Sequence, residues 1–560
     1  MKKLLKKTLS LVLVLALTAS LAACGSAAGG AVAAPAEGAE QAAASGGTGA
    51  GAGTGTGEKI VNIGVTDTLG TLNPLNMDYA FINLYATSLM FLPLAGFTED
   101  TGYEGFIAES ISTEDNKVFD VKLRDDAVWS DGEPVVADDV IFTFLRMTCP
   151  EVANFNYDFS MFEGFGDDGS SPSGAESIDG IVKVDDKNLQ FKLKGHMNLN
   201  TFINNVATWI CILPSHVLKD IPAGELLSND WFNHPDVVDG PFKLDDYDPA
   251  HYISYSANDK YFKGRPKIDK LNFRVVQGSE LLAGLKSGEI DFLQPSISAV
   301  PVEDHAEIES MEGVTASYAP PVTNEMTYIN TRKITDKRVR QAIVYAIDRE
   351  TLLNSLLGGN GEIADGVIPS ASPFYDENGT KISYDPEKAK QLLSEAGWDG
   401  SQTISYYVGS NDEVVVRAAQ VVEQNLEAVG INVEIRTVDF ATLMEVGGSD
   451  EVDMFSVQYT ITPNDYYADL LTLADTEGES WTGGFFSEKL DKALQATQET
   501  TDEAELTKLF REVNEVIVDE VPLFSLYFLS NIGAVNDRLV NAKPTLYGAF
   551  NNIHEWDVED

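Results

Sequence analysis

Alternation of hydrophobic and polar positions marks several segments of the chain as β-strands. In residues 116–125, Phe119, Val121 and Leu123 alternate with polar neighbours, which is the pattern of a strand with one buried face. Similar patterns predict four further strands at 58–67, 188–195, 270–277 and 431–438.

Hydrophobic residues spaced by three and four positions predict helices among these strands. Residues 338–350 place a buried stripe on one helical face. Residues 384–398 also carry end signals, with Asp385 as the N-cap and Gly397 as the stop. A third helix is expected at 411–430. Strands and helices mixed over about 500 residues predict an α/β body with several sheets.

One acidic stretch, residues 128–144, raises the question of paired catalytic carboxylates. It holds Asp131, Glu133, Asp138 and Asp139 within nine positions. Asp131 belongs to an Asp-Gly turn, and Asp138 and Asp139 fall in the first turn of a helix, where acids complement the helix dipole. The flanks supply arginines but no base, nucleophile or metal ligand. We therefore assign these acids structural roles.

Length, charge and composition narrow the class of protein. The chain has 560 residues, more than one hydrophobic core supports, so two or more lobes are expected. It carries 39 basic and 87 acidic residues, and a net charge of −48 would repel nucleic acid. Three cysteines are too few for a disulfide framework, and six scattered histidines lack zinc-site spacing. Neither a metal nor a cofactor is expected.

The first 24 residues have the parts of a secretory signal. Four lysines precede a short apolar run, Leu11 to Leu21, which is shorter than the ~20 residues that span a bilayer. The end, LAAC, resembles the bacterial lipobox, which implies cleavage before Cys24 and diacylglyceryl attachment to its sulfur. A plain secreted protein is the alternative. Residues 25–57, rich in Gly, Ala, Ser and Thr, are expected to tether a body on the extracytoplasmic face of the membrane.

A series of blocks resembles the family 5 extracytoplasmic solute-binding proteins of ABC importers, the oligopeptide- and dipeptide-binding family. LRDDAVWSDGEPVVADDVIFTF at 123–144 looks like the fingerprint of that family. Later blocks follow in the family's order, among them NDKYFKGRPKIDKLNFRVV at 258–276 and YINTRKITDKRVRQAIVYAIDRE at 328–350. The resemblance extends from about residue 60 to 555, nearly all of the chain beyond the tether.

The resemblance implies a two-lobed α/β fold of the type II periplasmic-binding-protein kind, with an extra domain in the first lobe. Cys149 and Cys211 would both fall in the extra domain, either as a disulfide or as two free buried thiols. The expected bounds are 58–325 plus 520–560 for lobe one, about 96–230 for the extra domain, 330–519 for lobe two, and Asn324–Asn330 and Glu520–Leu523 for the crossovers.

Candidate binding residues in lobe two come from the same resemblance. Family members fix the α-ammonium group of a peptide with an aspartate in this lobe, which is a charge-assisted bond. Asp465 is the best match to that aspartate and Asp469 the second, while an ordinary solvated loop is the alternative for either. Tyr459 stands where members often have Trp.

Candidates in lobe one follow the LNP block at 72–74. Asp78 takes the position of an acid that contacts peptide in some members, and Tyr79 lies on the same ligand-facing edge. Tyr157 matches an aromatic lining position, with core packing as its alternative. The weaker candidates are Phe440 and Trp481.

The resemblance implies a binding protein and no enzyme. Ligand would shift an equilibrium between open and closed lobes, and the closed form would dock on an ABC permease. The expected partners are a peptide, the permease and, through the lipid on Cys24, the membrane, and the protein would act as a monomer. Open alternatives are an oligosaccharide, nickel chelate, haem or glutathione as ligand, or a signalling role. A hydrolase would need a nucleophile–base constellation, which the sequence lacks.

Overall fold

A computed structural model describes most of the chain beyond residue 56. The residues from 58 onward form one compact unit. No helix among the described residues is long and apolar enough to cross a membrane. The described residues are 57–77, 80–152, 154, 158–410, 413–447, 449–462, 464–467, 470 and 482–559.

The sheet of the first lobe has seven strands in the order β12-β19-β11-β1-β10-β9-β8. β1 pairs in parallel with β10 on one side and β11 on the other, so the first strand is central. We call this sheet and its helices lobe one. Its elements are β1 (Ile60–Val65), β8 (Phe242–Asp248), β9 (Tyr252–Ala257), β10 (Lys270–Val275), β11 (Phe292–Leu293), β12 (Val314–Tyr318), β19 (Ile532–Asn536), α2 (Phe81–Ser88), α7 (Gly278–Ser287) and α8 (Val302–Glu309).

The second lobe is built on a six-stranded sheet in the order β14-β18-β13-β17-β15-β16. Helices α9 to α12 bury their apolar stripes against one face of it. The chain enters this sheet from β12 to β13 and returns from β18 to β19. The elements of lobe two are β13 (Thr323–Ile329), β14 (Gly361–Glu362), β15 (Thr403–Gly409), β16 (Asn432–Val438), β17 (Met454–Thr460), β18 (Leu523–Leu529), α9 (Lys337–Ala346), α10 (Arg349–Leu357), α11 (Pro386–Ala396), α12 (Glu413–Ala428), α13 (Phe440–Val446), α15 (Glu488–Glu499) and α16 (Glu503–Glu520).

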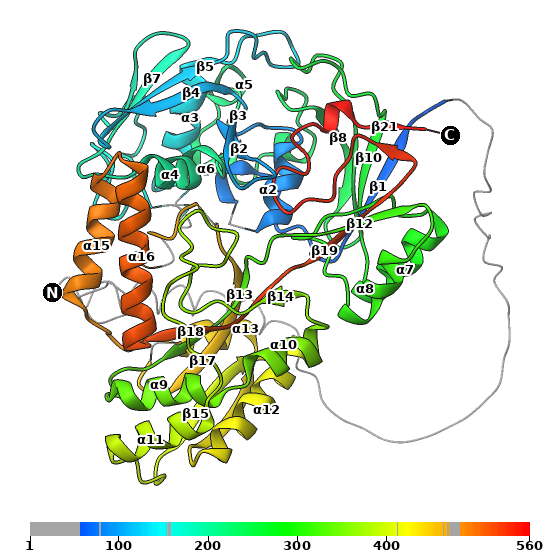
Figure 1. Ribbon diagram of the computed structural model, residues 1–560. Helices are drawn as coiled ribbons and strands as arrows, with labels where there is room; N and C mark the ends of the chain where they lie inside the picture. The colour runs from blue at the N-terminus through cyan, green and yellow to red at the C-terminus, as the bar shows by residue number, and fades with distance from the viewer. Residues whose placement is uncertain are drawn as a thin grey trace, which may run out of the picture. The chain divides into compact units, whose positions relative to one another are not determined.

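A third, smaller sheet of four antiparallel strands, in the order β4-β5-β7-β6, lies among the segments between β1 and β8. Phe119 of β5 stacks on Phe202 of α4, with ring centroids 4.0 Å apart, and ties the sheet to its helices. We call the region 108–226 the small-sheet module (Figure 1). It contains β4 (Ala108–Thr113), β5 (Val118–Leu123), β6 (Ile181–Lys183), β7 (Asn188–Lys192), α3 (Ala137–Thr148), α4 (Leu199–Phe202), α5 (Ser215–Leu218) and α6 (Ala223–Leu226).

Short elements complete the fold around these three sheets. Two hairpin-like pairs, β2 with β3 and β20 with β21, are antiparallel. The remaining bounds are β2 (Ala95–Phe97), β3 (Tyr103–Gly105), β20 (Leu539–Val540), β21 (Asp557–Val558), the 3-10 turns Pro74–Asn76, Asp230–Asn233 and Ile553–Glu555, and a π-turn at Ile203–Ala207.

The five predicted strands are all present, as β1, β5, β7, β10 and β16. Two of the three predicted helices are also confirmed, as α11 and α12. Asp385 caps α11 by accepting a hydrogen bond from the Lys388 N–H at 2.8 Å, and Gly397 ends it with a φ of +72°. That left-handed conformation suits a residue without Cβ.

The helix predicted at 338–350 is present as α9, but its predicted end is wrong. Helix α9 ends at Ala346, because Ile347 is extended, with φ −93° and ψ 120°. Asp348 then starts a new helix, α10, by accepting a hydrogen bond from the Thr351 N–H at 3.0 Å. An N-cap side chain can therefore interrupt an apolar stripe whose spacing looks continuous.

The acids of the 128–144 stretch bind backbone groups and neighbouring side chains, in keeping with the structural roles expected of them. Asp139 is 1% exposed and accepts hydrogen bonds from the Val136 N–H at 2.9 Å and the Trp129 indole N–H at 3.1 Å. Asp131 contacts His216 at 2.8 Å, and Asp138 pairs with Lys183 at 2.8 Å. These contacts give three of the four acids a partner within the fold.

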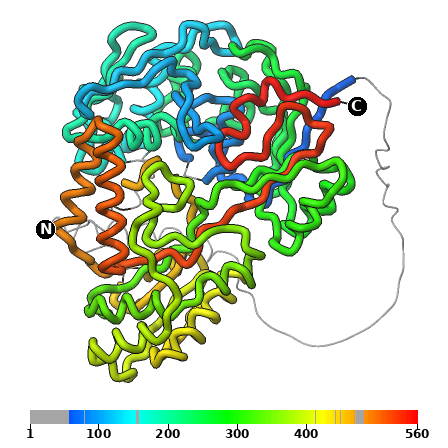
Figure 2. Tube along the Cα trace, viewed as in Figure 1, coloured from blue at the N-terminus to red at the C-terminus, as the bar shows by residue number. Residues whose placement is uncertain are grey.

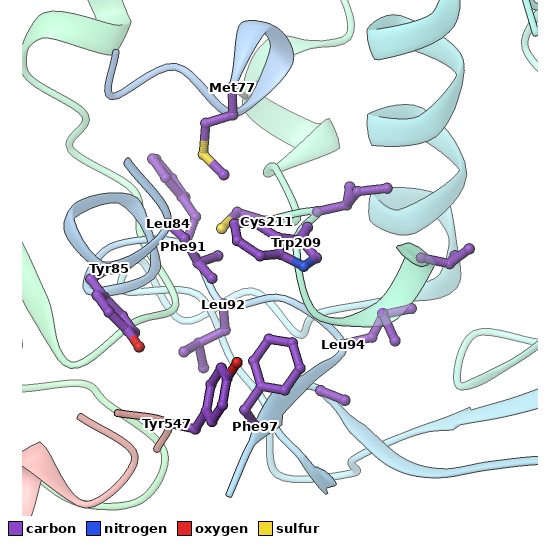
Figure 3. Packing of buried hydrophobic residues seen from close by; sticks show 14 of the residues in the cluster. Met77, Leu84, Tyr85, Phe91, Leu92, Leu94, Phe97, Trp209, Cys211 and Tyr547 are labelled. Atoms are coloured by element: carbon purple, nitrogen blue, oxygen red, sulfur yellow. The ribbon is translucent and has the colours of Figure 1, made fainter. Parts of the chain in front are cut away.

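Aromatic side chains from distant segments fill the core between lobe one and the small-sheet module. Phe97 lies 5.1 Å from Tyr547 and 6.5 Å from Trp209, measured between ring centroids. Figure 3 shows these rings in the packed apolar core that also contains Cys211. Cys149 and Cys211 are both buried and free. Of the two alternatives expected for them, two free buried thiols are therefore present and a disulfide is not.

The two ends of the described chain meet in lobe one. Figure 2 shows the blue β1 beside the red C-terminal segment. Lys59, just before β1, pairs with Asp557 of β21, and Arg538 pairs with the buried Asp291 at 2.6 Å. Lobe one is therefore completed only by the last strands of the chain.

Candidate functional site

Asp465 lies where lobe two meets the small-sheet module. It follows β17 by five residues, and its side chain is only 3% exposed. One carboxylate oxygen, Oδ1, accepts hydrogen bonds from the Tyr467 N–H at 3.0 Å and from the hydroxyl of Thr201 at 3.1 Å. Thr201 belongs to α4 of the module, so this carboxylate bridges the two parts of the molecule.

Three buried polar atoms around Asp465 have no hydrogen-bond partner within the described ranges. They are Oδ2 of Asp465, Oδ1 of Asn204 and the hydroxyl of Tyr103. A buried polar atom without a partner costs about 1–3 kcal/mol, so such atoms gather where another group is expected to bind. Two oxygen acceptors and a phenol suit a positively charged group with several N–H donors, such as an ammonium.

The electrostatics of this site agree with that reading. Burial raises the pKa of Asp465, and the hydrogen bond from the Tyr467 N–H partly offsets the rise. The pKa of Tyr103 is raised mainly by burial and, to a smaller extent, by the negative charge of Asp465. A cation bound at Asp465 would favour the ionised carboxylate and compensate for its burial.

Tyr459 lies on β17 directly opposite Asn324 of β13. Tyr459 is half-buried and packs against the hydrophobic core. Asn324 is 0% exposed, and neither atom of its side-chain amide has a partner among the residues that the structure describes. The Asn324 amide is thus a second buried polar group without a partner, and it lies opposite Tyr459, one of the candidate residues from the sequence.

A cavity of about 490 Å³ lies between the two lobes. Lobe one contributes Asp67 and Ser298 to its walls, and lobe two contributes Arg417 and Gln458. Its volume is within the range of about 300–1,000 Å³ typical of small-molecule sites. Because both lobes line it, its shape depends on how the lobes meet.

Several predicted residues cannot be placed in this geometry. Cys24, Asp78, Tyr79, Tyr157 and Asp469 lie outside the described residues, as does Trp481. Phe440 opens α13 and is 55% exposed.

The structure adds four residues that sequence reasoning missed: Tyr103, Thr201, Asn204 and Asn324. The sequence alone does not single them out. The segment 199–213, which holds Thr201 and Asn204, also contains Asn200, Asn205 and Thr208, and β13, which holds Asn324, also contains Thr323, Glu325 and Thr327. What distinguishes the four residues is the burial of their polar atoms in the folded chain.

Comparisons with known proteins support one assignment. Residues 102–481 match the bacterial extracellular solute-binding proteins, family 5, in their middle region. The oligopeptide-binding protein AppA of Bacillus subtilis is 27% identical over 473 residues, covering 80% of this chain and 82% of that protein.

Solved structures show the same fold. AppA of Bacillus subtilis in complex with a nonapeptide superposes with a TM-score of 0.70 at 23% identity, covering 90% of this chain and 100% of that one. NikZ of Campylobacter jejuni in complex with Ni(L-His) gives a TM-score of 0.69 at 21% identity, covering 89% and 99%. The fold is the two-lobed type II periplasmic-binding-protein fold with an extra domain in the first lobe. The protein belongs to the bacterial extracellular solute-binding proteins of family 5.

Proposed function

We propose that this protein captures peptides between its two lobes and delivers them to an ABC importer. The observation that carries the proposal is the buried Asp465 carboxylate with an open oxygen beside two further open polar atoms. A relative named for oligopeptide binding and a neighbour solved with a nonapeptide support peptide as the ligand class.

In this proposal the α-ammonium of the peptide binds Oδ2 of Asp465. Thr201 and the Tyr467 N–H hold the other oxygen and so fix the orientation of the carboxylate. The rest of the peptide occupies space between the lobes, where main-chain hydrogen bonds give affinity with little dependence on its sequence. Binding shifts the protein toward its closed form, which the permease receives.

The division of the chain is part of the proposal. Lobe one comprises residues 58–325 and 520–560 with the extra domain at about 96–230, and lobe two comprises 330–519. The three sheets support this order of parts, except that β18 (Leu523–Leu529) pairs with β13 in the sheet of lobe two, so the return to lobe one comes after it. The protein acts as a monomer and has no catalytic activity of its own. Incubation of a peptide pool with the purified protein should leave every peptide intact by mass spectrometry.

We also propose that Cys24 carries the lipid anchor on the extracytoplasmic face of the membrane. The lipobox resemblance LAAC supports it, and two acyl chains hold a protein at a bilayer far better than one. In cells, Cys24→Ser should move the protein from the membrane fraction to the soluble extracytoplasmic fraction. Retention of the variant in the membrane fraction would contradict the anchor.

Mass spectrometry of ligand released on denaturing purified 58–560 tests the ligand class. A mixture of short peptides is the expected result. A single oligosaccharide, nickel chelate, haem or glutathione would replace peptide as the ligand and leave the two-lobe capture mechanism in place. If nothing is released, the protein is titrated with a pool of free-amine peptides by calorimetry. The absence of any heat of binding would contradict the proposal.

A further inference from the structure

Two asparagines of the small-sheet module reach across to lobe two and bind the end of one helix. Asn116, in the turn between β4 and β5, donates from its amide to the carbonyl oxygens of Gln498 at 3.1 Å and Thr500 at 2.8 Å. Asn198, just before α4, donates to the carbonyl of Thr497 at 3.2 Å. The three acceptors belong to the last turn and C-cap of α15.

The last carbonyls of a helix have no partner within the helix and must find one elsewhere. Here the partners come from another part of the fold rather than from the residues that follow α15. Four of the five residues involved are nearly inaccessible, with Asn116 at 1%, Asn198 at 3%, Thr497 at 0% and Gln498 at 4% exposure, while Thr500 is half-buried. Separation of the module from α15 would therefore expose several groups that are now paired.

Asn198 also links this contact to the binding site. Its side-chain oxygen caps α4 by accepting from the Thr201 N–H at 2.9 Å, while its nitrogen binds α15. The hydroxyl of the same Thr201 binds Asp465. One short helix thus holds both the end of α15 and the carboxylate proposed to bind ligand.

Lobe two itself holds α15 through its neighbour α16. The two helices pack along each other (Figure 1). The end of α16 is fixed to α9, where the Arg340 guanidinium donates to the Glu520 carbonyl at 2.9 Å and Lys337 pairs with Asp519 at 2.9 Å. A displacement of the end of α15 would therefore move the body of lobe two with it.

We propose that Asn116 and Asn198 form a clasp on the carboxyl end of α15 that holds lobe two against the small-sheet module and thereby sets ligand affinity without touching ligand. This inference rests on the proposed capture between lobes. When only a fraction of the protein is in the binding-competent state, the apparent affinity falls by that fraction. Asn116 and Asn198 are thus positioning residues.

The first test is Asn116→Gly. Asn116 has a φ of +57°, which glycine adopts without strain, so the change removes the side chain and leaves the backbone. Asn541→Gly is a matched control, because Asn541 has a φ of +65° and donates to the Glu555 carbonyl at 3.0 Å within lobe one. We expect Asn116→Gly to weaken peptide binding about three- to tenfold and Asn541→Gly to leave it unchanged.

A second variant, Asn198→Asp, keeps the oxygen that caps α4, since aspartate is an equally good N-cap. It replaces the donor to α15 by an oxygen that repels the Thr497 carbonyl. We expect a loss of affinity at least as large as that of Asn116→Gly, with a normal circular dichroism spectrum. Wild-type affinity in both folded variants would overturn the clasp.

Small-angle scattering of the ligand-free proteins separates this inference from the proposed function. If the clasp holds the lobes together, both variants have a larger radius of gyration than the Asn541→Gly control, whether or not peptide binds. If the wild type binds no peptide but the variants expand, the clasp stands and peptide capture fails. Equal radii in all proteins, with or without ligand, would overturn the clasp.

Discussion

At the residue scale, two buried aspartates contrast in what surrounds them. Asp465 has polar neighbours with open atoms and lies where two parts of the molecule meet. Asp239 is 0% exposed and accepts a hydrogen bond from the Leu92 N–H at 2.9 Å, deep in the core that also holds Cys211. A ligand can compensate the charge of the first, whereas the second has only the interior of the protein around it.

Asp465→Asn tests the role of the first aspartate. The change keeps the shape of the side chain and removes its charge, so binding of free-amine peptides should weaken about tenfold or more. N-acetylated peptides, which carry no ammonium, should bind the variant and the wild type with similar affinity. Calorimetry with matched free and acetylated peptides measures both, and equal losses for the two would exclude the role.

The same site predicts a pH dependence of binding. Burial raises the pKa of Asp465 above 3.8, and an ammonium ligand favours the ionised form. Peptide binding therefore releases a proton, and affinity should fall as the pH drops through the raised pKa. Asp465→Asn should show a flatter profile between pH 4 and 7. A wild-type profile as flat as that of the variant would contradict this linkage.

Asp239 predicts an effect on stability with a definite sign. Burial raises its pKa well above 3.8, and the nearby Asp139 adds to the rise. The folded protein then binds more protons than the unfolded chain above pH 3.8, so stability falls as the pH rises. Above pH 3.8, the free energy of unfolding of Asp239→Asn should therefore rise relative to that of the wild type by up to about 1.4 kcal/mol for each pH unit. A constant difference in unfolding free energy from pH 4 to 7 would refute it.

At the scale of elements, periodicity located strands and helices well but not where one helix ended. The capping signals of α11 were read correctly because Asp385 and Gly397 stand at the ends of an apolar stripe. Asp348 directly follows such a stripe, so its capping role was missed and the predicted helix ran to residue 350, four residues past the end of α9. Local pattern does not decide between a cap and an exposed helical acid when both fit the spacing.

The N-cap of α11 gives a test at this scale. Asp385→Ala removes the acceptor for the Lys388 N–H and should lower the free energy of unfolding by about 1 kcal/mol. Asp385→Asn keeps an oxygen acceptor and should lower the free energy of unfolding by only a few tenths of a kcal/mol. Urea denaturation measures both. An alanine variant as stable as the asparagine variant would show that the cap contributes little.

At the scale of the whole molecule, the fold class was within reach of the sequence, whereas the contacts around Asp465 were not. Thr201 and Asp465 are separated by 264 positions along the chain. No periodicity or spacing reports a contact of that range, and the resemblance pointed only to the residues that match the family's blocks. The cross-lobe partners became visible only with the burial and hydrogen bonds of the folded chain.

The order of strands in lobe one also constrains how the protein is made. β19, at residues 532–536, lies between β11 and β12, which are complete by residue 318. During synthesis, the sheet of lobe one therefore cannot be completed until more than two hundred further residues, including all of lobe two, have been made. Such long-range pairing folds slowly and leaves strand edges exposed. A ribosome that stops before residue 532 would release a chain whose first lobe lacks a strand inside its sheet, which makes early termination a route to aggregation.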